Sequence, residues 1–132
     1  MYLGSYKTEF SGKNRLILPR KWRRELGNDE KFWVFLGQNG EIWGFDQEDW
    51  SKQAGSILEI PLSSVEGRLK RLKFFPQADE CILDGQGRFI LPQEIAQRAN
   101  LQGQILMVGA GDHFEIWDAQ EWEKFRIRLD AS

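Results

Sequence analysis

The strongest chemical signal in the sequence is a run of basic residues near the amino terminus. Between residues 13 and 24 the chain carries positive side chains and no acid. The six bases are Lys13, Arg15, Arg20, Lys21, Arg23 and Arg24. Several cations on one surface suit a phosphate backbone, because each neutralised phosphate releases a counterion and strengthens binding. The run therefore predicts an anion-binding surface. The alternative is a solvated face, or ion pairs with acids of a neighbouring subunit.

Other reactive side chains do not gather into a site. His113 is the only histidine and falls at a predicted hairpin turn. Cys81 is the only cysteine and has no partner at metal-ligand spacing, so we expect it to pack as a small hydrophobe. The GAGD stretch at 109–112 lacks the G-x-G-x-x-G pattern and is interpreted as a turn. We expect no catalytic residue, no metal, no cofactor and no small-molecule substrate, and therefore a protein that is not an enzyme.

The overall composition indicates the class of protein, but the net charge does not reveal the basic run. The chain has 132 residues, a net charge of −2, 29% charged and 41% hydrophobic side chains, which suits one compact domain or two very small ones. No apolar run is long enough to cross a bilayer, and no signal-peptide core opens the chain. A lone cysteine suits a reducing compartment. These features predict a cytoplasmic protein with no membrane partner.

A nine-residue phrase occurs twice and contains part of the basic run. Residues 11–19 read SGKNRLILP and residues 84–92 read DGQGRFILP, so the two copies lie 73 positions apart. After each phrase the pattern predicts a short helix that begins near the proline, then a hairpin of two strands, then a helix capped by aspartate. A linking helix is expected over 61–75. This succession indicates an internal duplication.

The start of each phrase predicts a tight turn. In the second copy Asp84 suits an Asx turn, Gly87 suits a left-handed backbone, and Arg88 is expected to pair with Asp84 and lock the turn. The matching positions of the first copy hold Ser11, Asn14 and Arg15. Ser makes a weaker turn bond than Asp, and Asn is the best non-glycine choice for left-handed geometry. We expect Arg15 to point out of its turn.

Each copy is too small to bury a sizeable core by itself. We therefore expect a mainly β fold with short helices, in which the two copies pack as an intrachain pseudo-dimer and share one core. The predicted divisions are a first repeat at 5–48 that carries the basic run and faces the anionic partner, the linking helix at 61–75, a second repeat at 77–120 that serves as scaffold, and a helix end at 121–132.

The pattern D-x-x-G-R-hydrophobic-x-hydrophobic-P resembles the signature of swapped-hairpin domains of the AbrB and SpoVT type. Two such units in one chain, with ADECILDGQGRFILP at 78–92, resemble the MraZ family over essentially the whole sequence. The resemblance implies two tandem swapped-hairpin units in a nucleoid-associated bacterial transcriptional regulator of the division and cell-wall cluster. It also implies a homo-oligomeric ring, often octameric, that binds short G-rich repeats in promoter DNA.

The resemblance assigns expected roles to the basic run. Arg15 is the candidate for base contact, because an arginine can bond to guanine O6 and N7 in the major groove. Lys13, Arg20, Lys21 and Arg23 are expected to hold phosphates and set the register, with Arg24 on the same helix face as Arg20. The alternative function is a non-catalytic interaction ring whose basic patch binds an acidic partner. Preference for promoter DNA over scrambled DNA separates the two.

Overall fold

Both copies of the repeat contribute the same succession of elements. The computed structural model describes residues 1–132. The first copy supplies β1 (Ser5–Thr8), β2 (Arg15–Ile17), α1 (Arg20–Leu26), β3 (Lys31–Leu36), β4 (Ile42–Phe45) and α2 (Gln47–Leu58). The second copy supplies β5 (Asp79–Ile82), β6 (Arg88–Ile90), α4 (Gln93–Arg98), β7 (Ile105–Gly109), β8 (Phe114–Asp118) and α5 (Ala119–Asp130). Between the copies lies α3 (Val65–Phe74), and short 3-10 turns cover Gly27–Asp29 and Phe75–Gln77.

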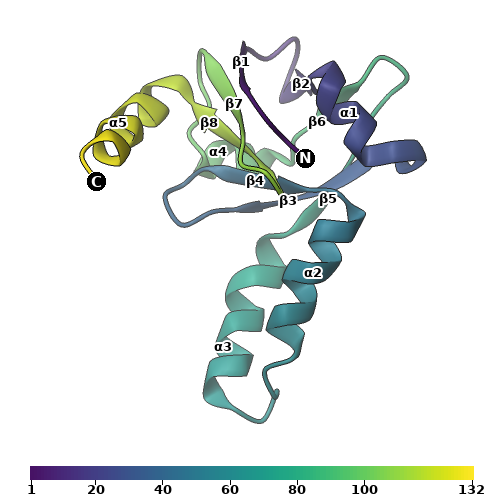
Figure 1. The fold of residues 1–132 in the computed structure, drawn as a ribbon, viewed down its shortest axis with the longest axis vertical. Helices are drawn as coiled ribbons and strands as arrows, with labels where there is room; N and C mark the ends of the chain where they lie inside the picture. The colour runs from purple at the N-terminus through teal and green to yellow at the C-terminus, as the bar shows by residue number, and fades with distance from the viewer.

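The strands of the two copies interleave in one sheet. Six antiparallel strands run in the order β1-β7-β8-β4-β3-β5, and β2 pairs with β6 in a separate ribbon (Figure 1). The first strand of each copy therefore pairs with the third strand of the other, and β4 meets β8 at the centre. Neither copy completes the sheet alone. The predicted fold class, strands with short helices and two copies sharing one core, is confirmed.

The ribbon and α1 contribute large apolar side chains to the core. Leu16 and Phe89 face each other across the ribbon, and the Phe89 ring meets Phe32 of β3 with 4.9 Å between centroids. Trp22 of α1 stacks on Phe114 of β8 at 5.2 Å. All five side chains are at most 2% exposed. Burying a residue of this size contributes roughly 1.5–3 kcal/mol, so burial fixes where α1 and the ribbon lie on the sheet.

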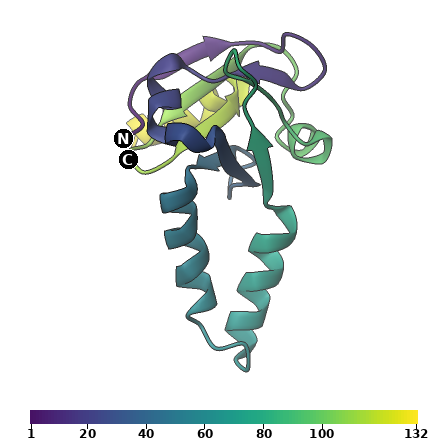
Figure 2. The same ribbon diagram turned by 90° about the vertical axis from the view of Figure 1, so that its right-hand side faces the viewer.

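A hairpin of helices projects from this body. α2 and α3 run side by side and join at a loop far from the sheet (Figure 2). Each helix begins with a side-chain cap: Asp46 Oδ1 accepts the Asp49 N–H at 2.9 Å, and Ser64 Oγ accepts the Gly67 N–H at 2.9 Å. Such caps satisfy backbone donors that a helix start leaves free. No helix has the length and apolar content that a membrane crossing needs.

Candidate nucleic-acid interface

The turn of the second copy is locked by its aspartate. Asp84 Oδ1 accepts the backbone N–H groups of Gln86 and Arg88, each at 2.9 Å, and Asp84 Oδ2 pairs with Arg88 Nε at 2.9 Å. The backbone bonds from Arg88 and Gln86, together with the Arg88 side chain, hold the pKa of Asp84 below its usual value. The charge of Arg88 is thus neutralised within its own turn, and it is not free for an anionic ligand.

The turn of the first copy has the same shape without the carboxylate. Asn14 adopts a left-handed φ of 58°, close to the 79° of Gly87. Arg15 donates from Nε to Ser11 Oγ at 3.2 Å and from Nη2 to the Ser11 carbonyl at 2.8 Å. The guanidinium therefore folds back over its turn rather than projecting freely. Ser11 is neutral, so no carboxylate in this turn balances the positive charge of Arg15. In the second turn the Asp84 carboxylate balances Arg88, and this is the electrostatic difference between the two turns.

Helix α1 presents three cations to solvent and two apolar side chains to the core. Trp22 and Leu26 are buried, whereas Arg20, Lys21 and Arg24 are exposed and form no ion pair. The spacing predicted this division, because residues 22 and 26 fall one helical turn apart. The cations of α1 are therefore available to a ligand.

Arg23 is placed differently from its neighbours on α1. It is half-buried, and its Nε donates to the Leu18 carbonyl at 3.0 Å. Its guanidinium lies so close to Gly87 of the second copy that a Cβ at residue 87 would overlap it. The sequence predicted a phosphate contact for Arg23, but the structure engages this side chain within the molecule.

A groove runs between β1 and α1. It has a volume of about 520 Å³, and its apolar lining includes Ile17, Pro19 and the buried Met107. Four of its lining residues are the cations Lys7, Arg20, Lys21 and Arg24. We call this the basic groove, and we call these four together with Lys13 the free cations, since none of the five forms an ion pair.

Lys7 is the cation of this groove that the sequence analysis did not predict. It lies on β1, before the repeated phrase, and it comes beside α1 because β1 pairs with β7 and Tyr6 of β1 packs against Trp22 of α1. Its alternation with the more buried Tyr6 and Thr8 was the one signal that it faces solvent. The structure thus adds a strand residue to a surface predicted from a loop and a helix.

The corresponding region of the second copy is neutralised. A smaller groove of about 270 Å³ includes Pro92, Glu94 and Arg98, and Glu94 pairs with Arg98 at 3.1 Å. Glu94 stands at the position that Lys21 holds in the first copy. Glu80, which matches Lys7, pairs with Lys31 at 3.6 Å. The two copies share one backbone plan, but only the first leaves a cluster of free cations beside its helix.

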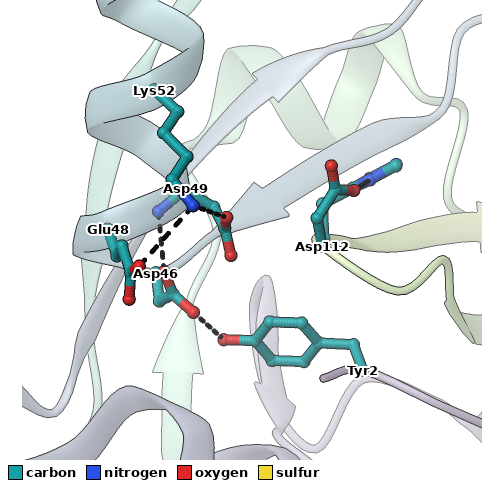
Figure 3. Close-up of polar contacts among 7 residues, drawn as sticks. Tyr2, Asp46, Glu48, Asp49, Lys52 and Asp112 are labelled. Carbon is teal, nitrogen blue, oxygen red and sulfur yellow. Dashed lines mark hydrogen bonds and ion pairs between the residues drawn. The ribbon is translucent and has the colours of Figure 1, made fainter.

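Acids gather instead at the start of α2. The Tyr2 hydroxyl donates to Asp46 Oδ2 at 2.9 Å, with Asp49, Asp112 and Lys52 around it (Figure 3). Burial, then the charge and hydrogen bond of Asp46, raise the pKa of Tyr2. Burial and the charges of Asp46 and Asp112 also raise the pKa of Asp49, while Lys52 opposes the shift. This part of the surface repels anions, and no cluster in the molecule is arranged to hold a metal ion.

Comparison with known proteins identifies a family over the full length. The family model described as "MraZ protein, putative antitoxin-like" matches residues 1–72 and 74–132. A transcriptional regulator MraZ of Lactiplantibacillus plantarum is 35% identical over 132 residues, covering 100% of this chain and 92% of that protein. The transcriptional regulator MraZ of Caldicellulosiruptor saccharolyticus is 35% identical over 94% of this chain and 85% of its own. That of Heliobacterium modesticaldum is 30% identical over 100% and 91%.

Proposed function

The chain belongs to the MraZ family, and we propose that it regulates transcription by binding double-stranded promoter DNA with the surface around α1. One observation carries this proposal: four cations without ion pairs lie on and beside α1 and a fifth, Lys13, lies in the turn before β2, while matching positions of the second copy are neutral, acidic or paired. A duplicated scaffold has no structural need for that difference. A polyanion that contacts only the first copy accounts for it.

The free cations and Arg15 would take different parts in binding. The free cations Lys7, Lys13, Arg20, Lys21 and Arg24 hold phosphates, which positions the protein on the duplex without reading sequence. Arg15 reads bases. Its Nη1 makes no hydrogen bond in the structure, and its bonds to the exposed Ser11 can exchange for bonds to guanine O6 and N7. This exchange is easier from a neutral serine than from a carboxylate, whose charge-assisted bond is stronger.

A ring of several chains would multiply these modest contacts on repeated promoter elements. An exposed apolar stripe on the helical hairpin supports self-association, because monomers rarely leave such stripes uncovered. Its members are Leu58, Leu62, Val65, Leu69 and Leu72, each 47% to 76% exposed. Once one chain is bound, its linked neighbours meet the next element at high effective concentration. We place the regulator in the cytoplasm at the nucleoid, acting on the division and cell-wall cluster as its family resemblance implies.

The test is binding to the DNA upstream of the protein's own gene against a scrambled duplex of equal composition. We expect the wild type to prefer the native duplex and Arg15→Ala to lose that preference while it still binds both duplexes. Lys124→Ala, which removes an exposed lysine from α5, serves as the matched control and should behave as wild type. Equal binding of both duplexes by the wild type would favour the other candidate, an interaction ring that binds an acidic partner.

A further inference from the structure

The Leu18 peptide links α1 to the turn of the opposite copy. The Leu18 N–H donates to the Gly87 carbonyl at 2.9 Å, and the Leu18 carbonyl accepts from Arg23 Nε at 3.0 Å. The Arg23 guanidinium then lies over the Gly87 Cα, where any Cβ would overlap it. Each of these three residues, Leu18, Arg23 and Gly87, thus contacts the other two, and the contacts join the two copies. Leu18 lies just before α1, and Arg23 stands on α1 between the exposed Lys21 and Arg24.

The repeat provides an internal comparison for this contact. In the opposite direction the Leu91 N–H donates to the Asn14 carbonyl at 2.8 Å, so the two turns support each other in the same way. The residue that matches Arg23 in the second copy is Ala96, and the residue that matches Gly87 in the first copy is Asn14. A long side chain on one helix therefore goes with a glycine in the turn it faces. A short one goes with a turn residue that has a side chain.

Backbone geometry alone does not explain why one turn has glycine and the other asparagine. Asn14 and Gly87 both adopt left-handed φ values, 58° and 79°, and asparagine tolerates that conformation. The steric demand of Arg23 supplies the missing reason. A side chain at residue 87 would have to displace the guanidinium from the space beside it, whereas the residue that matches Arg23 in the other copy is the short Ala96.

We propose that Arg23 is a positioning residue and that the second copy's turn is its platform. Asp84 locks that turn with three hydrogen bonds, and the turn presents Gly87 to the guanidinium of Arg23. The contact fixes the start of α1 and so sets where Arg20 and Lys21 stand. The second copy thus acts on the DNA surface without touching DNA. The DNA part of this inference rests on the proposed function, whereas the contact itself does not.

A double-mutant cycle tests the contact in the absence of DNA. Gly87→Asn suits the left-handed backbone but must displace the Arg23 guanidinium from its place beside the Leu18 carbonyl, so we expect it to lower the thermal midpoint by about 4 °C. In the Arg23→Ala background the same substitution should cost less than half as much, because no guanidinium then occupies the space beside residue 87. Asn14→Gly is the matched control and should be additive with Arg23→Ala. Equal losses from Gly87→Asn in both backgrounds would overturn the proposal.

DNA binding by the folded variants, well below their midpoints, separates positioning from direct contact. We expect Arg23→Ala to lose several-fold in affinity with the wild-type salt dependence. Arg23→Gln should recover much of it, since Gln Nε2 occupies the place of Arg Nε and can donate to Leu18. A slope of log affinity against log salt that falls by about 0.9 in both variants would make Arg23 a phosphate contact instead.

Two further outcomes are decisive. Wild-type affinity in Arg23→Ala would show that the contact serves stability alone, which refutes its positioning role. If the wild type itself binds no DNA, the proposed function fails together with the positioning role. The coupling between residues 23 and 87 then still shows whether the second copy's turn holds α1.

Discussion

Replacing Lys21 by glutamine should lower the salt dependence of DNA binding by a fixed fraction. Lys21 is exposed, lines the basic groove and has no acidic partner, so its removal leaves the core and the ion pairs of the protein unchanged. Each neutralised phosphate contributes about 0.9 to the slope of log affinity against log salt. The five free cations therefore give a slope of about −4.5 for each chain on the DNA, and Lys21→Gln leaves about −3.6.

These slopes translate into a difference that equilibrium binding resolves. Between 50 and 200 mM salt the wild-type affinity should fall about 500-fold for each bound chain, and that of Lys21→Gln about 150-fold. The slope of Lys21→Gln should be about four fifths of the wild-type slope. This fraction does not depend on how many chains of a ring touch the duplex, because every chain loses the same contact. Fluorescence anisotropy with a labelled duplex measures both curves.

Lys124→Gln is the matched control for this measurement. It also removes one exposed lysine, but from α5, where Lys124 lies 3.4 Å from Glu121. Its slope should equal that of the wild type. The reasoning fails if Lys21→Gln keeps the full slope, or if Lys124→Gln lowers the slope as much, since net charge rather than the basic groove would then govern binding.

Three further predictions concern the turns, the thiol and the histidine. Ser11→Asp should raise the thermal midpoint and weaken DNA binding, because a carboxylate there would pair with Arg15 as Asp84 pairs with Arg88; thermal melts and anisotropy on one preparation would show opposite signs. Burial in the core raises the pKa of the Cys81 thiol to about 12, so a thiol reagent at pH 8 should label the unfolded chain and leave the folded one unlabelled. Burial lowers the pKa of His113, but hydrogen bonds to Glu115 and Asp112 outweigh it and leave the pKa raised. A raised folded pKa contributes stability that is complete below the unfolded value of about 6.5 and is lost as pH rises through the folded value. The wild type should therefore have a higher thermal midpoint than His113→Gln at pH 6, and this difference should shrink as the pH rises to 8. A difference that stays constant would contradict a raised pKa for His113.

The repeat made the sheet predictable, because it identified matching strands before any pairing was known. A copy too small to bury its own apolar face must share a core, and β1 and β5 do so by pairing with the other copy. The direction of Arg15 was not predictable in the same way. Whether a turn arginine projects or folds back depends on bonds of about 3 Å to Ser11, and sequence spacing carries no such distances.

The places that Lys7 and Arg23 take in the structure were not predictable from the sequence for a related reason. Lys7 joins the basic groove through long-range contacts, which are the pairing of β1 with β7 and the packing of Tyr6 on Trp22. Arg23 is one of a run of similar bases, and it differs from the exposed Arg24 through its contacts with Leu18 and with Gly87, which lies far along the chain. The informative comparison was between the copies. Arg23 and Ala96 hold matching positions, as do Gly87 and Asn14, and the approach of Arg23 to Gly87 joins the two differences.

Duplication explains why charge diverged between the copies while packing did not. Leu16 and Phe89 face each other across the ribbon, and both are buried. A change of volume at one of them must be met by the other, since a filled core tolerates neither cavity nor overlap. Lys21 and Glu94 are exposed on α1 and α4, so a change of charge at either leaves the shared core as it is. Outward positions are therefore free to specialise. Arg23 and Gly87 are different, because their contact joins the helix that carries the cations to the turn of the other copy. A substitution at one of these two residues therefore requires a compatible residue at the other.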